Sequence, residues 1–396
     1  MDITLSPQTV TWRTTGGILD FFVFLGPNPD HVTQQYTAVV GRPAMIPYWS
    51  LGFQLNKNGY GTLSEMKKVV NGIRNYDIPF DVQYADIDYM DRRLGFTIDP
   101  INYDGLSEFV EQMHNEWNMR FIIVLNPAIS IEEPPHEPPA HYPPHVQGDN
   151  YDVWIRRNNG ELETGKAWPF LPNSTTPATV GFPDFFKSQT RIWWSTLIIY
   201  FYHLELNFDG LRIDMNEPSS FTQLYDEECD TENLFNRPKF VPNIKSRNHI
   251  TDKTICLDGK QHYRNNMTDR YNVHSLYGYS QSEHTIEACR LATGKRCLVI
   301  SRSTFPGSSK YVQHWLGDNE SIWRHLKQSV IGMMEYSLFG FSYTGADICG
   351  HIGNATYEMC LRWHMLGAFY PLSRNNNGPD NVVSLRFLIA LLVIEN

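Results

Sequence analysis

The chain has 396 residues, 41% hydrophobic and 19% charged, which suits one large barrel domain or two ordinary domains. Its formal net charge is −10 and no basic run occurs, so nucleic acid and an anionic membrane are unsuitable partners. The apolar run at Phe387–Ile394 is far shorter than the roughly 20 residues of a membrane-spanning helix, so no direct membrane segment is expected.

The N-terminal sequence MDITLSPQTV has neither the basic nor the apolar region of a signal peptide. Residues 1–40, which include TWRTTGGILDFFVFLG, are expected to be strands outside the main domain. We interpret them as the tail of an N-terminal β-sandwich domain.

From residue 41 onward, short apolar runs alternate with helical patterns. Strands are expected at 46–55, 80–89, 119–127, 208–217, 297–305, 313–319 and 341–350. Helices are expected between them, for example at 64–75, 106–117 and 186–205. Each strand ends in polar residues, which predicts a (β/α)8 TIM-type barrel with its site at the carboxyl ends of the strands. No eighth strand is evident, so the barrel of residues 41–396 is expected to be truncated before its last strand, ending in a helix-like apolar stretch.

Two polar excursions interrupt this alternation, at about 131–180 and 222–280. The first begins with EEPPHEPPAHYPPHVQ, residues 132–147, whose prolines argue against a helix or a central strand. In a barrel such loops lie over the mouth of the active site, and a disordered insert is the alternative.

The segment FDGLRIDMNEPSSF, residues 208–221, ends a strand with several carboxylates. Because side chains alternate along a strand, Arg212 and Asp214 share one face. At the top of a barrel, Asp214 would be suited to attack the anomeric carbon of a sugar. A structural turn or a helix N-cap is an equally good interpretation of this aspartate from the segment alone.

The segment SRSTFPGSSKYVQHWLGDN, residues 301–319, supplies Arg302, Trp315 and Asp318. A retaining glycosidase needs a second carboxyl group as its acid/base, and Asp318 follows a different strand from Asp214. Arg302 is suited to bind a sugar hydroxyl or to favour ionisation of a neighbouring carboxylate.

In VQYADIDYMD, Asp86 and Asp88 are expected on one strand face. No histidine or further carboxylate accompanies them at metal-ligand spacing, so sugar hydroxyls are the preferred ligand. Trp168 in GKAWPF and Asp347 in TGADICG are further candidates.

These segments, together with GRPAMIPYWSLGFQL, FPDFF and LGAFYPLSRN, resemble glycoside hydrolase family 31 over essentially the whole chain. They are most similar to the intestinal enzymes of the maltase-glucoamylase and sucrase-isomaltase type. The resemblance implies that Asp214 is the nucleophile and Asp318 the acid/base. It also implies that the terminal glucose is bound or organised by Asp86, Arg302 and Asp347, within a wall of Ile87, Trp168, Met215, Phe221 and Trp315.

The resemblance further implies a secreted or apical cell-surface protein, whose membrane anchor is not in this chain. Its disulfides would be Cys229–Cys256 and Cys349–Cys360, and Cys289 and Cys297 have no evident counterpart. Four N-glycosylation sequons agree weakly with the secretory pathway. They begin at Asn173, Asn266, Asn319 and Asn354.

Four positions depart from the family pattern where substrate would bind. Arg212 stands where the family has Trp, and Asn376 stands where it has His. Asn126 replaces an Asp, and His351 replaces a Phe. The expected function is a retaining α-glucosidase that acts on maltose and malto-oligosaccharides without a metal or an organic cofactor. A catalytically impaired carbohydrate-binding pseudoenzyme and a non-functional fragment remain the alternatives.

Overall fold

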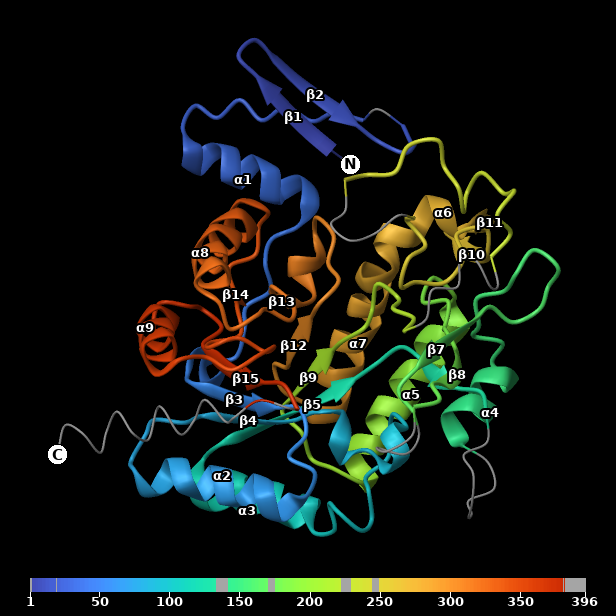
Figure 1. The fold of residues 1–396 in the computed structure, drawn as a ribbon. Helices are drawn as coiled ribbons and strands as arrows, with labels where there is room; N and C mark the ends of the chain where they lie inside the picture. Colours follow the sequence, from blue (N-terminus) through green and yellow to red (C-terminus); the bar gives the residue numbers. More distant parts are fainter. Residues whose placement is uncertain are drawn as a thin grey trace. The chain divides into compact units, whose positions relative to one another are not determined.

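The computed structural model describes residues 2–18, 20–132, 142–169, 175–221, 229–243, 249–379 and 381. The chain forms two compact units, which are described separately (Figure 1). The barrel unit comprises residues 26–126, 194–216 and 278–396. The excursion unit comprises residues 1–25, 127–193 and 217–277.

The barrel unit is built on one parallel sheet, in which eight strands of the described chain lie in the order β14-β13-β12-β9-β5-β4-β3-β15. In chain order they are β3 (Gln54–Lys57), β4 (Val82–Ala85), β5 (Arg120–Leu125), β9 (Gly210–Ile213), β12 (Leu298–Ser301), β13 (Gln313–Trp315), β14 (Thr344–Gly345) and β15 (Arg374–Asn377). Every neighbouring pair is parallel. The sheet confirms the predicted (β/α)8 barrel, and each of the seven expected strands overlaps one of its strands. The first, expected at 46–55, begins only at Gln54, because residues 48–51 form a short 3-10 helix.

The expected truncation before the last strand is wrong, because β15 is the eighth strand. It pairs with β3 from Arg374 opposite Gln54 to Asn377 opposite Lys57. On its other side the amide of Ile348 donates to the Arg374 carbonyl at 3.0 Å, which joins β15 to the chain after β14. The strand has the sequence RNNN and is wholly buried, and hydrogen bonds stabilise it. It could not be recognised from the sequence, because it lacks the apolar residues that identify a buried strand.

Helices alternate with the strands. The predicted helices at 64–75, 106–117 and 186–205 are confirmed as α2 (Leu63–Asn75), α3 (Leu106–Trp117) and α5 (Ser188–Leu204). The other helices are α1 (Pro29–Val40), α7 (Tyr277–Thr293), α8 (Trp323–Leu338) and α9 (Tyr357–Gly367). In α2, the Thr62 hydroxyl caps the first turn by accepting from the Glu65 amide at 3.2 Å. Met66, Val70 and Ile73 then recur at helical spacing and are fully buried. None of the helices in the described chain combines the length and the apolar run needed to cross a membrane.

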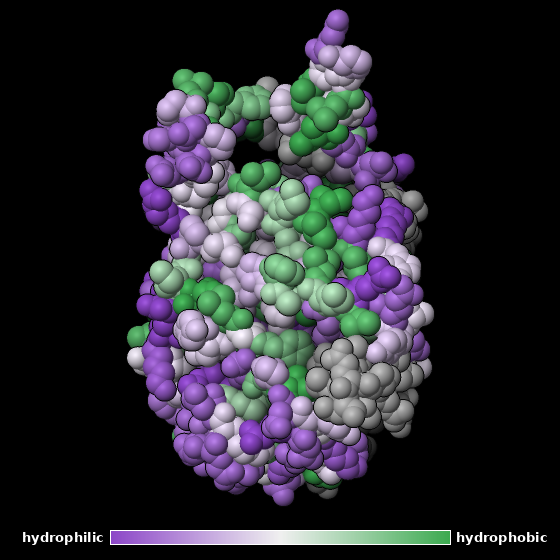
Figure 2. All heavy atoms as spheres, turned by 90° about the vertical axis from the view of Figure 1, so that its left-hand side faces the viewer, coloured by the Kyte–Doolittle hydropathy of each residue, from purple (hydrophilic) through white to green (hydrophobic). Residues whose placement is uncertain are grey.

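The interior of the barrel is apolar below the strand ends. Val82, Ile122, Leu298 and Ile300 belong to one buried cluster with Trp315. The outward faces of α8 and α9 also carry exposed apolar side chains, among them Met334, Leu338 and Met365, and Figure 2 views the molecule from this side.

The sheets in the described part of the excursion unit are small and antiparallel. They are the hairpin β1 (Asp2–Ser6)–β2 (Thr9–Arg13), the sheet of β6 (Ile129–Ser130), β7 (Thr164–Ala167) and β8 (Ala178–Gly181), and the hairpin β10 (Lys260–Tyr263)–β11 (Asn266–Asp269). No strand follows β2 in the described residues up to Asn28, and residues 29–40 form α1 instead of strands. Strand expectations beyond Arg13 were therefore wrong. A proline at N1 and the Asn28 side chain, which accepts from the His31 amide at 3.1 Å, start this helix.

The Pro-rich segment holds a second correction. Residues 143–150 form helix α4 (Pro143–Asn150), although the prolines argued against a helix. The first two helical residues are prolines, at positions whose amides have no partner within the helix, so proline is tolerated there. The remaining prolines of this segment, the sequon at Asn173 and the C-terminal apolar run lie outside the described residues.

Candidate active site

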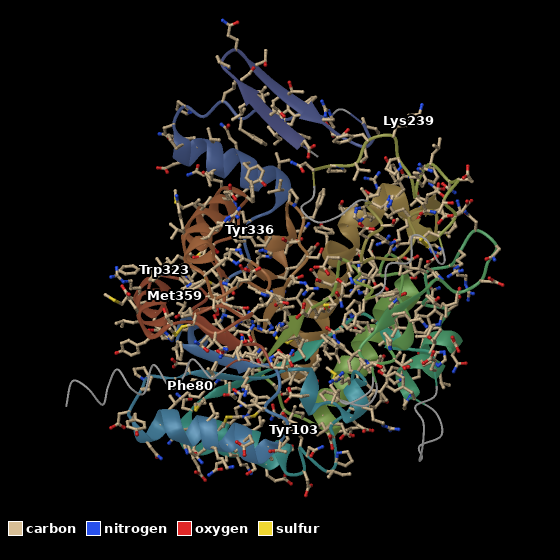
Figure 3. The ribbon with its side chains drawn as sticks, viewed as in Figure 1. Phe80, Tyr103, Lys239, Trp323, Tyr336 and Met359 are labelled. Atoms are coloured by element: carbon tan, nitrogen blue, oxygen red, sulfur yellow. A yellow bond between two sulfur atoms is a disulfide. The ribbon has the colours of Figure 1, made fainter. Side chains whose placement is uncertain are left out.

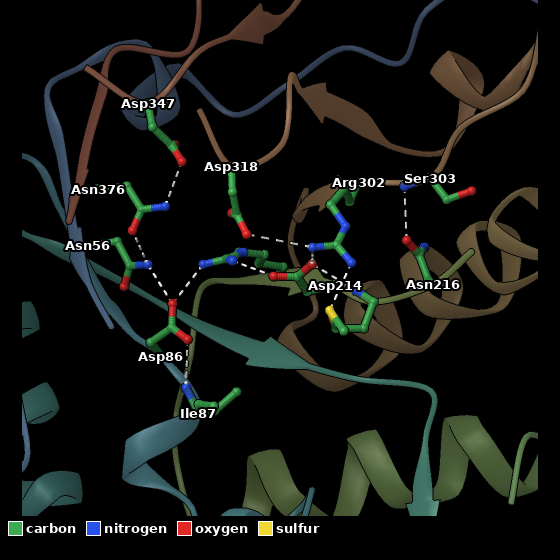
Figure 4. Close-up of polar contacts among 12 residues, drawn as sticks. Asn56, Asp86, Ile87, Asp214, Asn216, Arg302, Ser303, Asp318, Asp347 and Asn376 are labelled. Atoms are coloured by element: carbon green, nitrogen blue, oxygen red, sulfur yellow. Dashed lines mark hydrogen bonds and ion pairs between the residues drawn. The ribbon is translucent and has the colours of Figure 1, made fainter. Parts of the chain in front are cut away.

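Polar side chains gather where the barrel strands end. Since all eight strands run parallel, their carboxyl ends share one rim. Figure 4 shows most of these residues and the polar contacts that join them. Each strand contributes: Asn56 (β3), Asp86 (after β4), Asn126 (after β5), Arg212 (β9), Asp214 (after β9), Arg302 (after β12), Asp318 (after β13), Asp347 (after β14) and Asn376 (β15).

Asp214 directly follows β9 and is 7% exposed. Its Oδ1 accepts from the Met215 amide at 2.7 Å and lies 3.1 Å from Nη1 of Arg302. Its Oδ2 accepts from Nη2 of Arg212. Burial alone would raise the pKa of Asp214, but the charges of Arg212 and Arg302 outweigh burial and hold this pKa at about 2. The carboxylate is therefore fully ionised at neutral pH.

Arg212 is a buried cation between two carboxylates. Nη1 donates to Oδ2 of Asp86 at 2.8 Å, and Nη2 donates to Asp214. The guanidinium carbon lies 4.8 Å from the centroid of the Trp315 ring, which is itself wholly buried. Such a stacked cation gains from the ring quadrupole. The nucleophile candidate thus shares its positive partner with Asp86.

Asp318 lies three residues beyond β13, and its side chain is 37% exposed. Nη1 of Arg302 lies 4.0 Å from Oδ2 of Asp318, and the same nitrogen contacts Asp214 (Figure 4). Burial raises the pKa of Asp318 above its ordinary value, and the negative charges of Asp214 and Asp347 act in the same direction. The environments of Asp214 and Asp318 therefore push the two pKa values apart.

Asp86 also caps a short helix, η2 (Ile87–Tyr89). Its Oδ1 accepts from the Ile87 amide at 2.9 Å, and its Oδ2 accepts from Nδ2 of Asn56 at 2.7 Å as well as from Arg212. Ile87 is buried beside it. Most acceptor positions of Asp86 are thus engaged by the protein.

Two other carboxylates of the expected clusters lie elsewhere. Asp88 does not share a strand face with Asp86, because β4 ends at Ala85 and Asp88 lies within η2. It accepts from the Gly61 amide at 2.8 Å and from the Tyr103 hydroxyl at 2.6 Å (Tyr103 is labelled in Figure 3). Asp209 precedes β9 and contacts His114 at 2.6 Å, so it lies at the opposite end of that strand from Asp214.

A buried polar chain crosses from β14 to β4. Asp347 is 0% exposed and accepts from Nη2 of Arg374 at 2.6 Å and from Nδ2 of Asn376 at 2.8 Å. Asn376 in turn accepts from Nδ2 of Asn56 at 2.8 Å, which also donates to Asp86 (Figure 4). The sequence did not point to Asn56 or Arg374, although the uncharged amide of Asn56 near the end of an expected strand was a usable signal.

The other predicted residues fall into two groups. Met215 lies beside Arg302, with its sulfur 2.8 Å from Nη2, and His351 is buried near Asp318 and Asp347. Asn126 is half-buried, and its Oδ1 has no hydrogen-bond partner in the described part of the chain. Trp168 and Phe221 belong to the excursion unit, where their rings pack edge to face at 4.4 Å.

All six cysteines are paired. The structure contains the two disulfides that the resemblance implies, Cys229–Cys256 and Cys349–Cys360. It also contains a third, which joins Cys289 in α7 to Cys297, the residue before β12, at a sequence separation of 8.

Curated relatives are similar along nearly the whole chain. The chain is 46% identical over 400 residues to "Probable maltase-glucoamylase 2" of Homo sapiens, covering 95% of this chain and 16% of that protein. It is 45% identical over 398 residues to intestinal sucrase-isomaltase of Suncus murinus, covering 96% of this chain and 22% of that protein. The chain therefore spans less than a quarter of the length of either relative.

Solved structures share the fold. The Tris-bound glucosidase II alpha subunit superimposes with a TM-score of 0.76 at 23% identity, covering 93% of this chain and 36% of that one. The TIM-barrel domain of glycosyl hydrolases family 31 matches residues 43–385. Since this match covers most of the chain, the chain belongs to glycosyl hydrolase family 31.

Proposed function

We propose that this chain forms the catalytic barrel of a retaining α-glucosidase, which releases terminal α-linked glucose from maltose and malto-oligosaccharides. One observation carries the proposal. A single nitrogen, Nη1 of Arg302, lies 3.1 Å from Asp214 and 4.0 Å from Asp318, while the two carboxyl groups have opposite pKa shifts. Two carboxyl groups whose pKa values are pushed apart in one site are the usual arrangement for a nucleophile and an acid/base.

In the proposed reaction, Asp318 in its protonated form donates its proton to the glycosidic oxygen. Asp214 attacks the anomeric carbon and forms a covalent glucosyl-enzyme as the leaving sugar departs. Asp318, now ionised, takes a proton from water, which attacks the same carbon and releases glucose with retained configuration. The raised pKa of Asp318 favours the protonated form that the first step needs.

Binding of the terminal glucose is proposed for Asp86, Arg302 and Asp347, with Ile87, Met215 and Trp315 in the surrounding wall. Their contacts divide these roles. Arg302 is partly exposed and can reach a ligand, whereas Asp347 is fully buried and holds Arg374 and Asn376 in place. We therefore assign Asp347 to organising the site. Trp168 and Phe221 remain proposed sugar contacts from the excursion loops.

A carbohydrate-binding pseudoenzyme is the second candidate function, and Arg212 is the observation that favours it. Its guanidinium occupies one oxygen of the proposed nucleophile and one oxygen of Asp86. A positive charge at this position opposes the developing charge of an oxocarbenium-like transition state. Binding with strongly reduced turnover would follow.

Proton NMR of maltose hydrolysis distinguishes these functions. The proposal expects α-glucose as the first product, and no product from the Asp214→Asn variant. Initial β-glucose would exclude the retaining mechanism, and unchanged turnover in Asp214→Asn would exclude this nucleophile. Binding of an iminosugar that mimics glucose, without turnover in a well-folded sample, would select the pseudoenzyme.

The cellular setting is proposed from the relatives and the disulfides. Two of the similar proteins are a maltase-glucoamylase and an intestinal sucrase-isomaltase, and three disulfides form in oxidising compartments. We infer passage through the secretory pathway to an extracellular or apical surface. Of residues 1–40, those up to Leu25 remain proposed as the end of a preceding β-sandwich domain, whereas residues 29–40 form helix α1 of the barrel unit.

A further inference from the structure

Two neighbouring loops bring a second set of ligating groups together beside the proposed acid/base. Asp318 follows β13, and Asp347 and His351 follow β14. One side-chain ligand atom from each of these three residues lies within 4.8 Å of the other two. Two carboxylates and one imidazole form an oxygen and nitrogen ligand set of the kind that binds zinc.

His351 provides the independent observation. The residue is 8% exposed, and its Nδ1 is buried without a hydrogen-bond partner in the described chain. A buried imidazole nitrogen without a partner loses the hydrogen bonds that water would give it. A metal ion coordinated through Nδ1 would supply the missing partner.

The loops are braced so that the ligands are already close. The Asn319 carbonyl accepts from the His351 amide at 2.8 Å, and Nδ2 of Asn319 donates to the Asp347 carbonyl at 3.0 Å. Asn319 directly follows Asp318, so one residue links all three ligand positions. The Ser321 hydroxyl adds a further bond, to the Cys349 carbonyl at 2.8 Å.

The buried ligand is oriented in the manner of known metal sites. Both oxygens of Asp347 accept hydrogen bonds, from Arg374 and Asn376, and outer partners of this kind fix a ligating carboxylate. Ligands on one tetrahedral zinc ion lie roughly 3.4 Å apart, so atoms that lie within 4.8 Å of one another must approach by up to about 1.4 Å. Asp318, with a side chain 37% exposed, is the member free to make that movement.

Nearby charges set the expected strength. Arg302 and Arg374 contact two of the ligands and, with Arg212, oppose a cation, whereas Asp214 attracts one. The local balance therefore favours a reversible site over a permanent structural one.

We propose that Asp318, Asp347 and His351 bind one Zn²⁺ ion, which withdraws Asp318 from proton transfer and inhibits hydrolysis reversibly. The inhibition rests on the proposed function, whereas the binding does not. The second buried cluster, Cys349, Cys360 and His364, does not compete, because its two sulfurs are joined in a disulfide.

The test is calorimetric titration of the full chain with Zn²⁺, in the absence of reductant and substrate. Wild type should bind one equivalent, and His351→Phe should weaken binding at least tenfold. His203→Gln, at an exposed histidine of α5, is the matched control and should bind like wild type. Asp318→Asn, a nearly isosteric change, is the second variant should His351→Phe fail to fold, and it should show the same weakening. X-ray absorption spectra at the zinc edge should show nitrogen and oxygen ligands without sulfur.

Equal binding by wild type and either ligand variant would overturn the site, as would no binding by wild type. Inhibition of maltose hydrolysis by Zn²⁺, reversed by EDTA, should follow the binding curve. Binding that depends on His351 in a protein without hydrolytic activity would refute the proposed function and leave the zinc site standing. Hydrolysis of maltose by a protein that does not bind Zn²⁺ through His351 would refute the zinc site and leave the proposed function standing.

Discussion

Replacing Arg212 by the family's tryptophan is the sharpest test of how this site has been altered. The substitution removes a cation that contacts both Asp86 and Asp214, and adds an aromatic wall. We expect kcat/KM for maltose to rise in Arg212→Trp, because the transition state would no longer develop positive charge beside a fixed guanidinium.

The contact geometry gives the size of the effect. Arg212 touches the attacking carboxylate, so the anomeric carbon bonded to that carboxylate would lie about 5 Å from the guanidinium carbon. Two like charges about 5 Å apart repel by about 3 kcal/mol at an effective dielectric constant of 20. This corresponds to about a hundredfold in rate. Asp86 neutralises part of the same charge, so the expected gain is between about tenfold and about a hundredfold.

The assay is glucose release from maltose by wild type, Arg212→Trp and the charge-retaining control Arg212→Lys. The double variant with Asp214→Asn should be silent, which ties the gained activity to this site. A folded Arg212→Trp protein that is no faster than wild type would refute the argument. An equal gain in Arg212→Lys would show that the charge is not the cause.

Three further predictions concern stability. Asp347→Asn should lower the free energy of unfolding by about 3–5 kcal/mol in urea titrations, because it leaves the buried guanidinium of Arg374 unpaired; a loss below about 1 kcal/mol would contradict this. Glu163 is buried, and burial raises its pKa from 4.5 to about 7, so the folded state binds its proton more tightly and stability should fall as pH rises from about 4.5 to 7. Glu163→Gln should therefore raise Tm more at pH 8 than at pH 5. The corresponding difference in the free energy of unfolding is up to about 3 kcal/mol, and an equal Tm shift at both pH values would contradict this prediction. Gly350→Ala should lower Tm, because φ is 87° and a Cβ would meet the Ser321 nitrogen at 2.5 Å; an unchanged Tm would show that this loop can shift freely.

The barrel was predictable because its strands and helices leave different periodic patterns in the sequence. Apolar strands such as β5 end in polar residues, and amphipathic helices such as α2 bury residues at helical spacing. The last strand, β15, was missed because Arg374–Asn377 contains no apolar residue. Hydrogen bonds to residues hundreds of positions away stabilise it, and the local sequence pattern does not reveal such partners.

The site was predictable in part for a related reason. The sequence motifs identified the residues that follow the strands, and the parallel sheet places Asp86, Asp214 and Asp318 at one rim of the barrel. Pairing within the site depends on side-chain direction. Asp88 shows this, since a turn of η2 beginning two residues after the strand directs it to Tyr103. The proximity of His351 to Asp318 and Asp347 was likewise not predictable, because it depends on the direction of side chains in the loops after β13 and β14.

Closure of the barrel through β15 also bears on the order of assembly. The last strand pairs with β3 across roughly 320 positions of sequence, and such distant contacts form slowly because a long loop must first be closed. Until Arg374–Asn377 docks, β3 and β14 present unpaired edges, which can pair with another chain. The four polar residues of β15 therefore complete the site and also cover sheet edges that would otherwise favour aggregation during folding. A substitution in β15 would reduce the yield of folded protein as well as its activity.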